Sequence, residues 1–168
     1  KLKSYAALET RFSDIAKQHP RGIPNFAKYK LYFLLEDIFN GVRNELMGLQ
    51  GPFVGYFHFW TPHAPYTANQ QFVGLFNDDW RPPSKSAHPL DGCATDQQLC
   101  QLRREYDEYI ANLDSEFGKF HQALLESGIL ENSYVIITSD HGELFERGVQ
   151  GHVTPLLYDP VIHIPLLI

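Results

Sequence analysis

Three short apolar runs, separated by long helical patterns, limit the folds open to this chain more than any other feature. The runs are residues 53–60, 134–138 and 161–168, and turn-forming or polar residues flank them. Apolar runs of this length predict buried strands. Strands that alternate with helices are typical of a mostly parallel sheet with helices on its faces. The sequence therefore predicts an α/β fold.

The helices are predicted from the spacing of apolar residues. Residues 101–127 give the clearest pattern, because apolar side chains recur at steps of four and three and Gly128 follows as a stop. Weaker patterns predict a helix over residues 4–18 and another from Asn25, a candidate N-cap, to Leu49. Residues 67–99 have little periodicity, and we expect them to form a long loop.

Length and charge narrow the classes of protein. The chain has 168 residues, enough for one domain with a sizeable core. Its formal net charge of -6 argues against a nucleic-acid binder, and no apolar run approaches the roughly 18 residues of a membrane span. An apolar run ends the chain at Ile168 and the first residue is Lys1, so we expect a domain truncated at both ends.

The two cysteines leave two interpretations open. Cys93 and Cys100 lie in one polar stretch, where they can form a local disulfide or remain two thiols. Their spacing does not predict a zinc site, because a structural zinc site needs four ligands and the chain has no second pair of cysteines.

Polar side chains follow two of the predicted strands. His63 comes just after residues 53–60, and Asp140 and His141 come just after residues 134–138. Ligands of open α/β sheets bind at the carboxyl ends of strands, so we expect these three side chains to converge there. Asp140 and His141 can both reach one metal ion, and Gly142 lets the backbone bend closely. The alternative is that Asp140 is an N-cap and His141 a surface residue.

Several segments, in order along the chain, resemble the sulfatase family of the alkaline phosphatase superfamily. Residues 132–143 (NSYVIITSDHGE) are similar to the C-terminal signature of that family, and residues 151–168 to the segment that follows it. Residues 62–66 (PHAPY) resemble the H-x-P-Y loop, and the helix with Tyr106, Asp107, Ile110 and Asp114 resembles another family helix. Residues 1–50 match nothing specific. The resemblance implies that residues 1–168 are part of a sulfatase-type catalytic domain.

The same resemblance implies roles for individual residues. Asp140 and His141 would be ligands of one divalent metal ion, and Ca²⁺, Mg²⁺, Mn²⁺ and Zn²⁺ all remain open, with His141 favouring Mn²⁺ or Zn²⁺. His63 would contact the sulfate or phosphate group or protonate the leaving oxygen. His152 lies where many sulfatases carry a lysine that contacts the transferred group. Neither Cys93 nor Cys100 fits the motif of the nucleophile, which becomes formylglycine in the family, so we expect this segment alone to be inactive.

The function implied is metal-dependent hydrolysis of a small-molecule or glycan sulfate ester by the whole protein. A first alternative is a phosphodiesterase, phosphonate hydrolase or phosphotransferase of the same superfamily, acting on a phosphate ester. A second is a non-catalytic binding homologue. The compartment and the oligomeric state stay open.

Other polar residues are assigned structural roles. His58 and His163 lie inside apolar runs and are expected to be satisfied core or interface histidines. Glu143 is expected to cap the next turn, and Asp114 to be structural.

Overall fold

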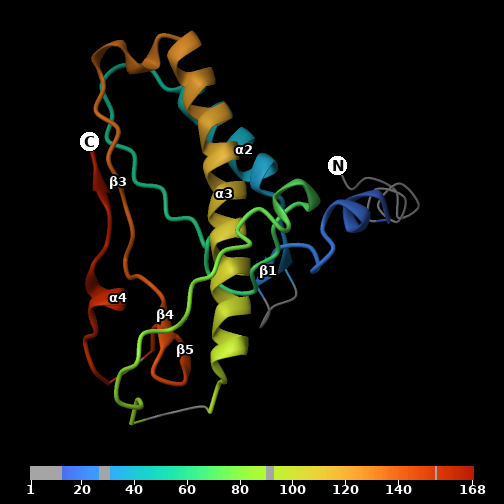
Figure 1. Cartoon of the computed structure of the whole chain (residues 1–168). Helices are drawn as coiled ribbons and strands as arrows, with labels where there is room; N and C mark the ends of the chain where they lie inside the picture. Colours follow the sequence, from blue (N-terminus) through green and yellow to red (C-terminus); the bar gives the residue numbers. More distant parts are fainter. Residues whose placement is uncertain (1–12, 27–30, 90–92, 154) are drawn as a thin grey trace. The chain divides into compact units, whose positions relative to one another are not determined.

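Helices α2 and α3 dominate the part of the chain that the computed structural model describes, which is residues 13–26, 31–89, 93–153 and 155–168 (Figure 1). Two compact units divide the chain: Lys1–Phe76 with Glu105–Ile129, and Asn77–Arg104 with Leu130–Ile168. Residues 13–18 are helical, which confirms the end of the first predicted helix, while residues 4–12 lie outside the described residues. The remaining elements are β1 (Asn25–Phe26), β2 (Leu31–Tyr32), α2 (Leu35–Gly48), η1 (Gln70–Phe72), α3 (Asp96–Glu126), η2 (Ile129–Asn132), β3 (Ile137–Thr138), β4 (Leu144–Glu146), β5 (Val149–Gly151), α4 (Asp159–Ile162) and β6 (Leu166–Leu167).

The long helix α3 confirms the clearest helical prediction and begins five residues earlier than residue 101. Its start is fixed by a capping box. The Thr95 hydroxyl accepts a hydrogen bond from the Gln98 backbone N–H at 3.2 Å, and Gln98 Oε1 accepts one from the Thr95 backbone N–H at 2.8 Å. Each side chain thus satisfies a backbone donor that the first helical turn leaves unpaired.

The predicted helix from Asn25 to Leu49 is wrong at residues 25–26 and 31–34, the part before α2 that the structure describes. Asn25–Phe26 and Leu31–Tyr32 pair as antiparallel strands, so their backbone groups bond across a hairpin and not along a helix. Asn25 is therefore no N-cap. Helix α2 begins at Leu35 with an extended Leu34 before it, and its acidic Glu36 lies in the first turn, where a negative charge is favourable.

Aromatic packing holds α2 in the core of the first unit. Phe39 is 5% exposed, and its ring centroid lies 5.1 Å from that of Phe59, 6.2 Å from that of Phe117 and 5.3 Å from that of Phe120. The last two residues lie on α3. Aromatic rings in tilted or edge-to-face contact at these separations stabilise the fold beyond the effect of burying their apolar surface. This aromatic cluster joins α2, α3 and the segment that precedes His63.

The strand predictions are only partly correct. Residues 53–60 form no strand, and Val54 and Tyr56 are exposed, because no described strand pairs with this segment. The second apolar run contains strand β3. The third run contains the end of helix α4 and then strand β6. Pro160 lies in the first turn of α4, where proline is well accommodated. Strand β6 returns against β3, with Ile137 opposite Leu167, so this pair is antiparallel. Every strand pair among the described residues is antiparallel, and the predicted mostly parallel sheet is not found there.

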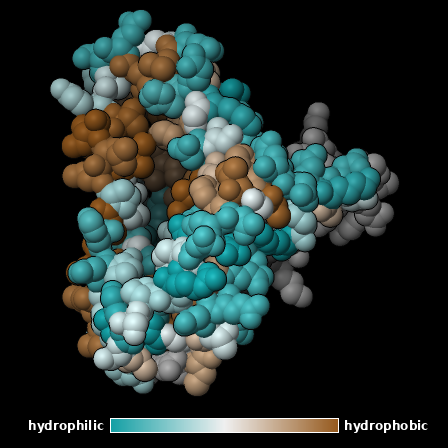
Figure 2. All heavy atoms as spheres, viewed as in Figure 1, coloured by the Kyte–Doolittle hydropathy of each residue, from teal (hydrophilic) through white to brown (hydrophobic). Residues whose placement is uncertain are grey.

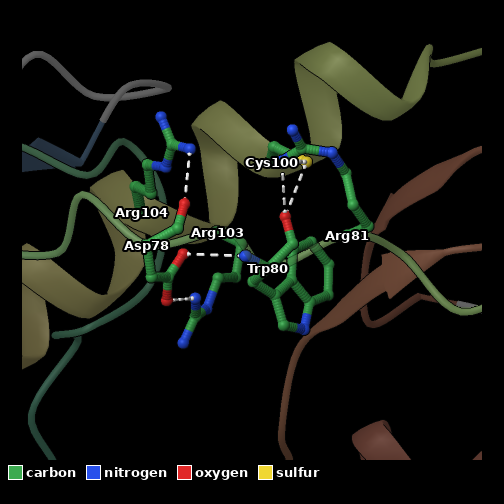
Figure 3. Close-up of polar contacts among 6 residues, drawn as sticks. All are labelled: Asp78, Trp80, Arg81, Cys100, Arg103 and Arg104. Carbon is green, nitrogen blue, oxygen red and sulfur yellow. Dashed lines mark hydrogen bonds and ion pairs between the residues drawn. The ribbon is translucent and has the colours of Figure 1, made fainter.

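The start of the predicted loop 67–99 contains η1, and a later part of the loop is anchored on the first turns of α3 (Figure 3). Asp78 forms an ion pair with Arg103, which lowers the pKa of the Asp78 carboxyl. Arg104 donates to the Asp78 carbonyl oxygen at 2.9 Å, and the Cys100 thiol donates to the Trp80 carbonyl oxygen at 3.3 Å. This part of the loop therefore has a defined path in the second unit.

Neither cysteine forms a disulfide. Cys93 is exposed, and Cys100 is buried against residue 80. Of the two interpretations of this pair, the structure supports two thiols.

Apolar side chains gather on the surface over β3 and β6 (Figure 2). Ile136 is 62% exposed, Leu166 67% and Leu167 56%. Within the described ranges, no helix combines the length and the apolar character that crossing a membrane requires.

Candidate active site

A two-stranded hairpin connects the segment that contains Asp140 and His141 with His152. In β4 and β5, Leu144 lies opposite Gly151 and Glu146 lies opposite Val149. The same register places Glu143 opposite His152 at the open end of the hairpin. The two side chains meet there, with His152 Nδ1 3.3 Å from Glu143 Oε1. The hairpin therefore brings a distant histidine back to the Asp140–Glu143 segment.

His152 also lies against the predicted metal ligand His141. Their ring centroids are 3.8 Å apart and their planes differ by 17°, so the two imidazoles are stacked. Both side chains are partly buried, at 32% exposed for His141 and 20% for His152. The structure thus brings together His141 and His152, which the sequence analysis placed at one site.

Gly142 fixes the turn that carries Asp140 and His141. Its backbone N–H donates to the Val161 carbonyl oxygen at 2.7 Å. A Cβ at this position would lie 2.1 Å from the Pro160 carbonyl oxygen, well inside van der Waals contact. Only glycine allows the two backbones to approach so closely, a reason for Gly142 different from the bend that the sequence suggested.

The geometry of Asp140 and His141 fits part of a metal site. Asp140 Oδ1 accepts from the His141 backbone N–H at 3.1 Å and lies 3.7 Å from His141 Nε2. His141 Nδ1 lies 2.8 Å from the Gly142 carbonyl oxygen. Because a carbonyl only accepts, Nδ1 carries the proton, and Nε2 presents a lone pair beside the carboxylate. Metal-binding histidines commonly use this arrangement. In the described ranges, no group of three or more histidine, cysteine and acidic side chains forms a complete site.

Glu143 has a role that the sequence analysis missed. Its side chain is 4% exposed and accepts from His152, so it orients that ring. Finding this role requires the register of the hairpin, which the sequence pattern did not predict.

His63 occupies a separate, well-anchored loop in the first unit. Its ring lies 4.1 Å from the Trp60 ring, and its Nδ1 donates to the Ala64 carbonyl oxygen at 2.8 Å. Tyr66 is 4% exposed and forms an edge contact with Tyr106 on α3 at 5.3 Å. His63 and Asp140 belong to different units, so their convergence stays a prediction.

Buried polar side chains of α3 hold the chain just after the His63 loop. Glu108 is 3% exposed, accepts from the Gly74 backbone N–H at 2.7 Å and forms an ion pair with Arg21. Asn112 accepts from the Asn69 backbone N–H at 2.8 Å. Buried carboxylates and amides with partners of this kind make the path of the backbone specific.

Two other histidines, expected to be core or interface residues, do not lie in the core of this chain. His58 is exposed and lies 6.4 Å from the Tyr56 ring, because its segment is not a buried strand. His163 is exposed at the end of α4, where its backbone N–H donates to the Asp159 carbonyl oxygen at 2.8 Å. Asp114 is exposed on α3.

Carboxylate and imidazole side chains, such as those on this turn, are common ligands of divalent metal ions. The chain belongs to the sulfatase family: the family described as Sulfatase matches residues 5–168. Membership of this family gives the chain an alkaline phosphatase-like α/β fold.

Named sulfatases are similar to the chain over part of their length. Arylsulfatase K of Xenopus laevis is 32% identical over 120 residues, which cover 66% of this chain and 21% of that protein. Choline-sulfatase of Rhizobium meliloti (strain 1021) is 27% identical over 129 residues, covering 66% of this chain and 25% of that protein. Arylsulfatase K of Homo sapiens is 26% identical over 157 residues, covering 76% and 29%. The chain thus spans roughly a fifth to under a third of the length of these relatives.

Proposed function

We propose that this chain is part of the catalytic domain of an enzyme that hydrolyses sulfate esters. Membership of the sulfatase family supports the reaction class, and the relatives carry arylsulfatase and choline-sulfatase names. The observation that carries the proposal is the cluster of Asp140, His141, Glu143 and His152 at the open end of the β4–β5 hairpin.

Asp140 and His141 are the residues that would hold a divalent metal ion. The proton of His141 is held on Nδ1 by the Gly142 carbonyl, so Nε2 can serve as the ligand atom beside the Asp140 carboxylate. When bound, such an ion polarises an oxygen of the ester and neutralises its charge. An imidazole in the ligand set suits Mn²⁺ or Zn²⁺ better than Ca²⁺, which prefers oxygen.

His152 is the residue proposed to contact the sulfate group. Glu143 holds its Nδ1–H, and the stacking on His141 fixes the plane of the ring. The substrate would therefore be met through Nε2, next to the metal ligands. The imidazolium form of the ring, which has a proton on both nitrogens, would donate its Nε2–H to the sulfate group. A preoriented donor that faces developing charge stabilises a transition state without reorganisation.

His63 is the residue proposed to protonate the leaving oxygen or to contact the sulfate. Its Nδ1–H is committed to the Ala64 carbonyl, and Trp60 packs on its ring, so the imidazole has a defined orientation. General acid catalysis by this ring would use the imidazolium form, in which Nε2–H is left to be given to the leaving oxygen within hydrogen-bond reach.

The whole protein with single substitutions provides the test. Asp140→Ala should lose bound metal and turnover of 4-nitrophenyl sulfate together. His63→Ala should keep the metal and lose turnover by about 10²- to 10⁴-fold, as expected for a lost general acid. His163→Ala, which changes an exposed histidine outside the cluster, is the matched control and should keep both.

The measurements are metal per protein by mass spectrometry and initial rates on matched aryl sulfate and aryl phosphate. A His63→Ala protein without metal beside an Asp140→Ala protein with metal would reverse the assigned roles. Turnover of the phosphate ester without turnover of the sulfate ester would support the phosphoryl-transfer alternative.

A further inference from the structure

The turn of the β4–β5 hairpin contains an unusual residue. Arg147 and Gly148 are the two residues between paired Glu146 and Val149, and their φ angles are 59° and 77°. Positive φ at both positions defines a type I′ turn, in which Asn or Gly is strongly preferred at the first position. An arginine is disfavoured there. A residue kept in such a conformation points to a role of its side chain.

The Arg147 guanidinium contacts three separate parts of the second unit. Its Nε donates to Glu146 Oε1 at 3.2 Å, and its Nη1 donates to the Ser86 carbonyl oxygen at 2.8 Å. Its Cζ lies 4.4 Å from the centroid of the Tyr158 ring, which is a cation–π contact. The side chain is 19% exposed. Lysine has no planar fork and cannot make these contacts together.

Backbone bonds extend this connection along the long loop. The Arg147 carbonyl oxygen accepts from the His88 backbone N–H at 3.1 Å, and the Gly148 carbonyl oxygen accepts from the Ala94 backbone N–H at 3.0 Å. Lys85 pairs with Glu146 at 2.8 Å. Lys85, Ser86, His88 and Ala94 are thus each attached to the hairpin turn or to the residue before it.

Tyr158 links the turn back to the candidate active site. Its carbonyl oxygen accepts from the Val161 backbone N–H at 2.9 Å at the start of α4. The Val161 carbonyl oxygen in turn accepts from the Gly142 backbone N–H, next to His141. The contacts form a closed ring: the hairpin turn, Tyr158, α4, Gly142 and the hairpin strands.

We infer that Arg147 is a positioning residue that closes this ring and so holds the Asp140–His141 turn and His152 in register. The inference rests on the proposed function for its catalytic consequence. Its structural content, the closed ring, stands on the contacts alone.

Arg147→Asn in the whole protein separates the side chain from the turn. Asn-Gly is the preferred type I′ pair, so the hairpin should survive, with a urea midpoint at or above that of the wild type. Loss of the guanidinium should speed hydrogen exchange at the amides of His88 and Gly142, and lower kcat/KM for 4-nitrophenyl sulfate by about tenfold. Arg147→Lys, which keeps the charge and the turn strain, should not rescue either readout.

The outcomes are separable. If the backbone amides of His88 and Gly142 exchange hydrogen at the wild-type rate in the Arg147→Asn protein, the inference is overturned, whatever the activity of that protein. Faster exchange with unchanged kcat and KM would overturn the positioning role. A wild-type protein without turnover of any sulfate ester would refute the proposed function, while the exchange at Gly142 would still decide whether Arg147 holds the turn.

Discussion

Gly142→Ala tests whether close backbone packing builds the candidate site. The new Cβ would lie 2.1 Å from the Pro160 carbonyl oxygen, and real Cβ contacts are at least 3.0 Å, so the backbones must separate by about 0.9 Å, the difference of the two values. The same shift would stretch the 2.7 Å bond from Gly142 to Val161 beyond hydrogen-bond range. Overpacking should cost about 1–3 kcal/mol and the lost hydrogen bond about 1 kcal/mol, so the free energy of unfolding should fall by about 2–4 kcal/mol.

The assay is urea unfolding of the whole protein. It measures the urea midpoint and the slope of the free energy of unfolding against urea concentration. Gly118→Ala is the matched control, because a Cβ there meets nothing within 4 Å and the residue lies inside α3. That variant should gain about 0.5–1 kcal/mol from helix propensity. If Gly142→Ala loses less than about 0.5 kcal/mol, as an ordinary surface change would, the packing argument is wrong.

Two further predictions concern α3. Thr95→Ala removes the hydroxyl of the capping box and should lower the free energy of unfolding by about 1 kcal/mol, whereas Thr95→Ser should keep the cap; equal losses in urea melts would contradict the role of the hydroxyl. Burial raises the pKa of Tyr109 above its ordinary value of 10.0, so the folded state keeps a proton that the unfolded state releases. The neutral Tyr109 side chain therefore contributes to the free energy of unfolding below about pH 10, and this contribution is lost as the pH rises above that value. Tyr109→Phe should reduce the decline of the urea midpoint at alkaline pH. Tyr134→Phe, at a 90% exposed position, should leave that decline unchanged.

Helix α3 was predictable because its signals are local. The apolar period marked its body, and the Thr95–Gln98 pattern, which the sequence analysis did not use, marks its start. The start of α2 was missed because backbone pairing in the β1–β2 hairpin overrode a weak helical period. Residues 53–60 have the composition of a buried strand, yet burial depends on neighbouring strands that a local pattern does not supply.

The candidate site divides in the same way. Asp140, His141 and Gly142 could be found from the sequence because they follow an apolar run directly. The partnership of Glu143 with His152 depends on the register of β4 and β5. Arg147-Gly148 is a poor turn signal, since arginine is rare at positive φ, and so the hairpin and its register were not predicted.

The register of that hairpin also sets a rule for how this segment can evolve. Eight residues, 144 to 151, separate Glu143 from His152. Substitutions among these eight residues should be tolerated, provided that the two strands and the turn still form. Their number is constrained, because a single insertion or deletion in either strand would turn His152 to the opposite face and away from Glu143. We therefore expect substitutions between these two residues to be tolerated far better than changes of length.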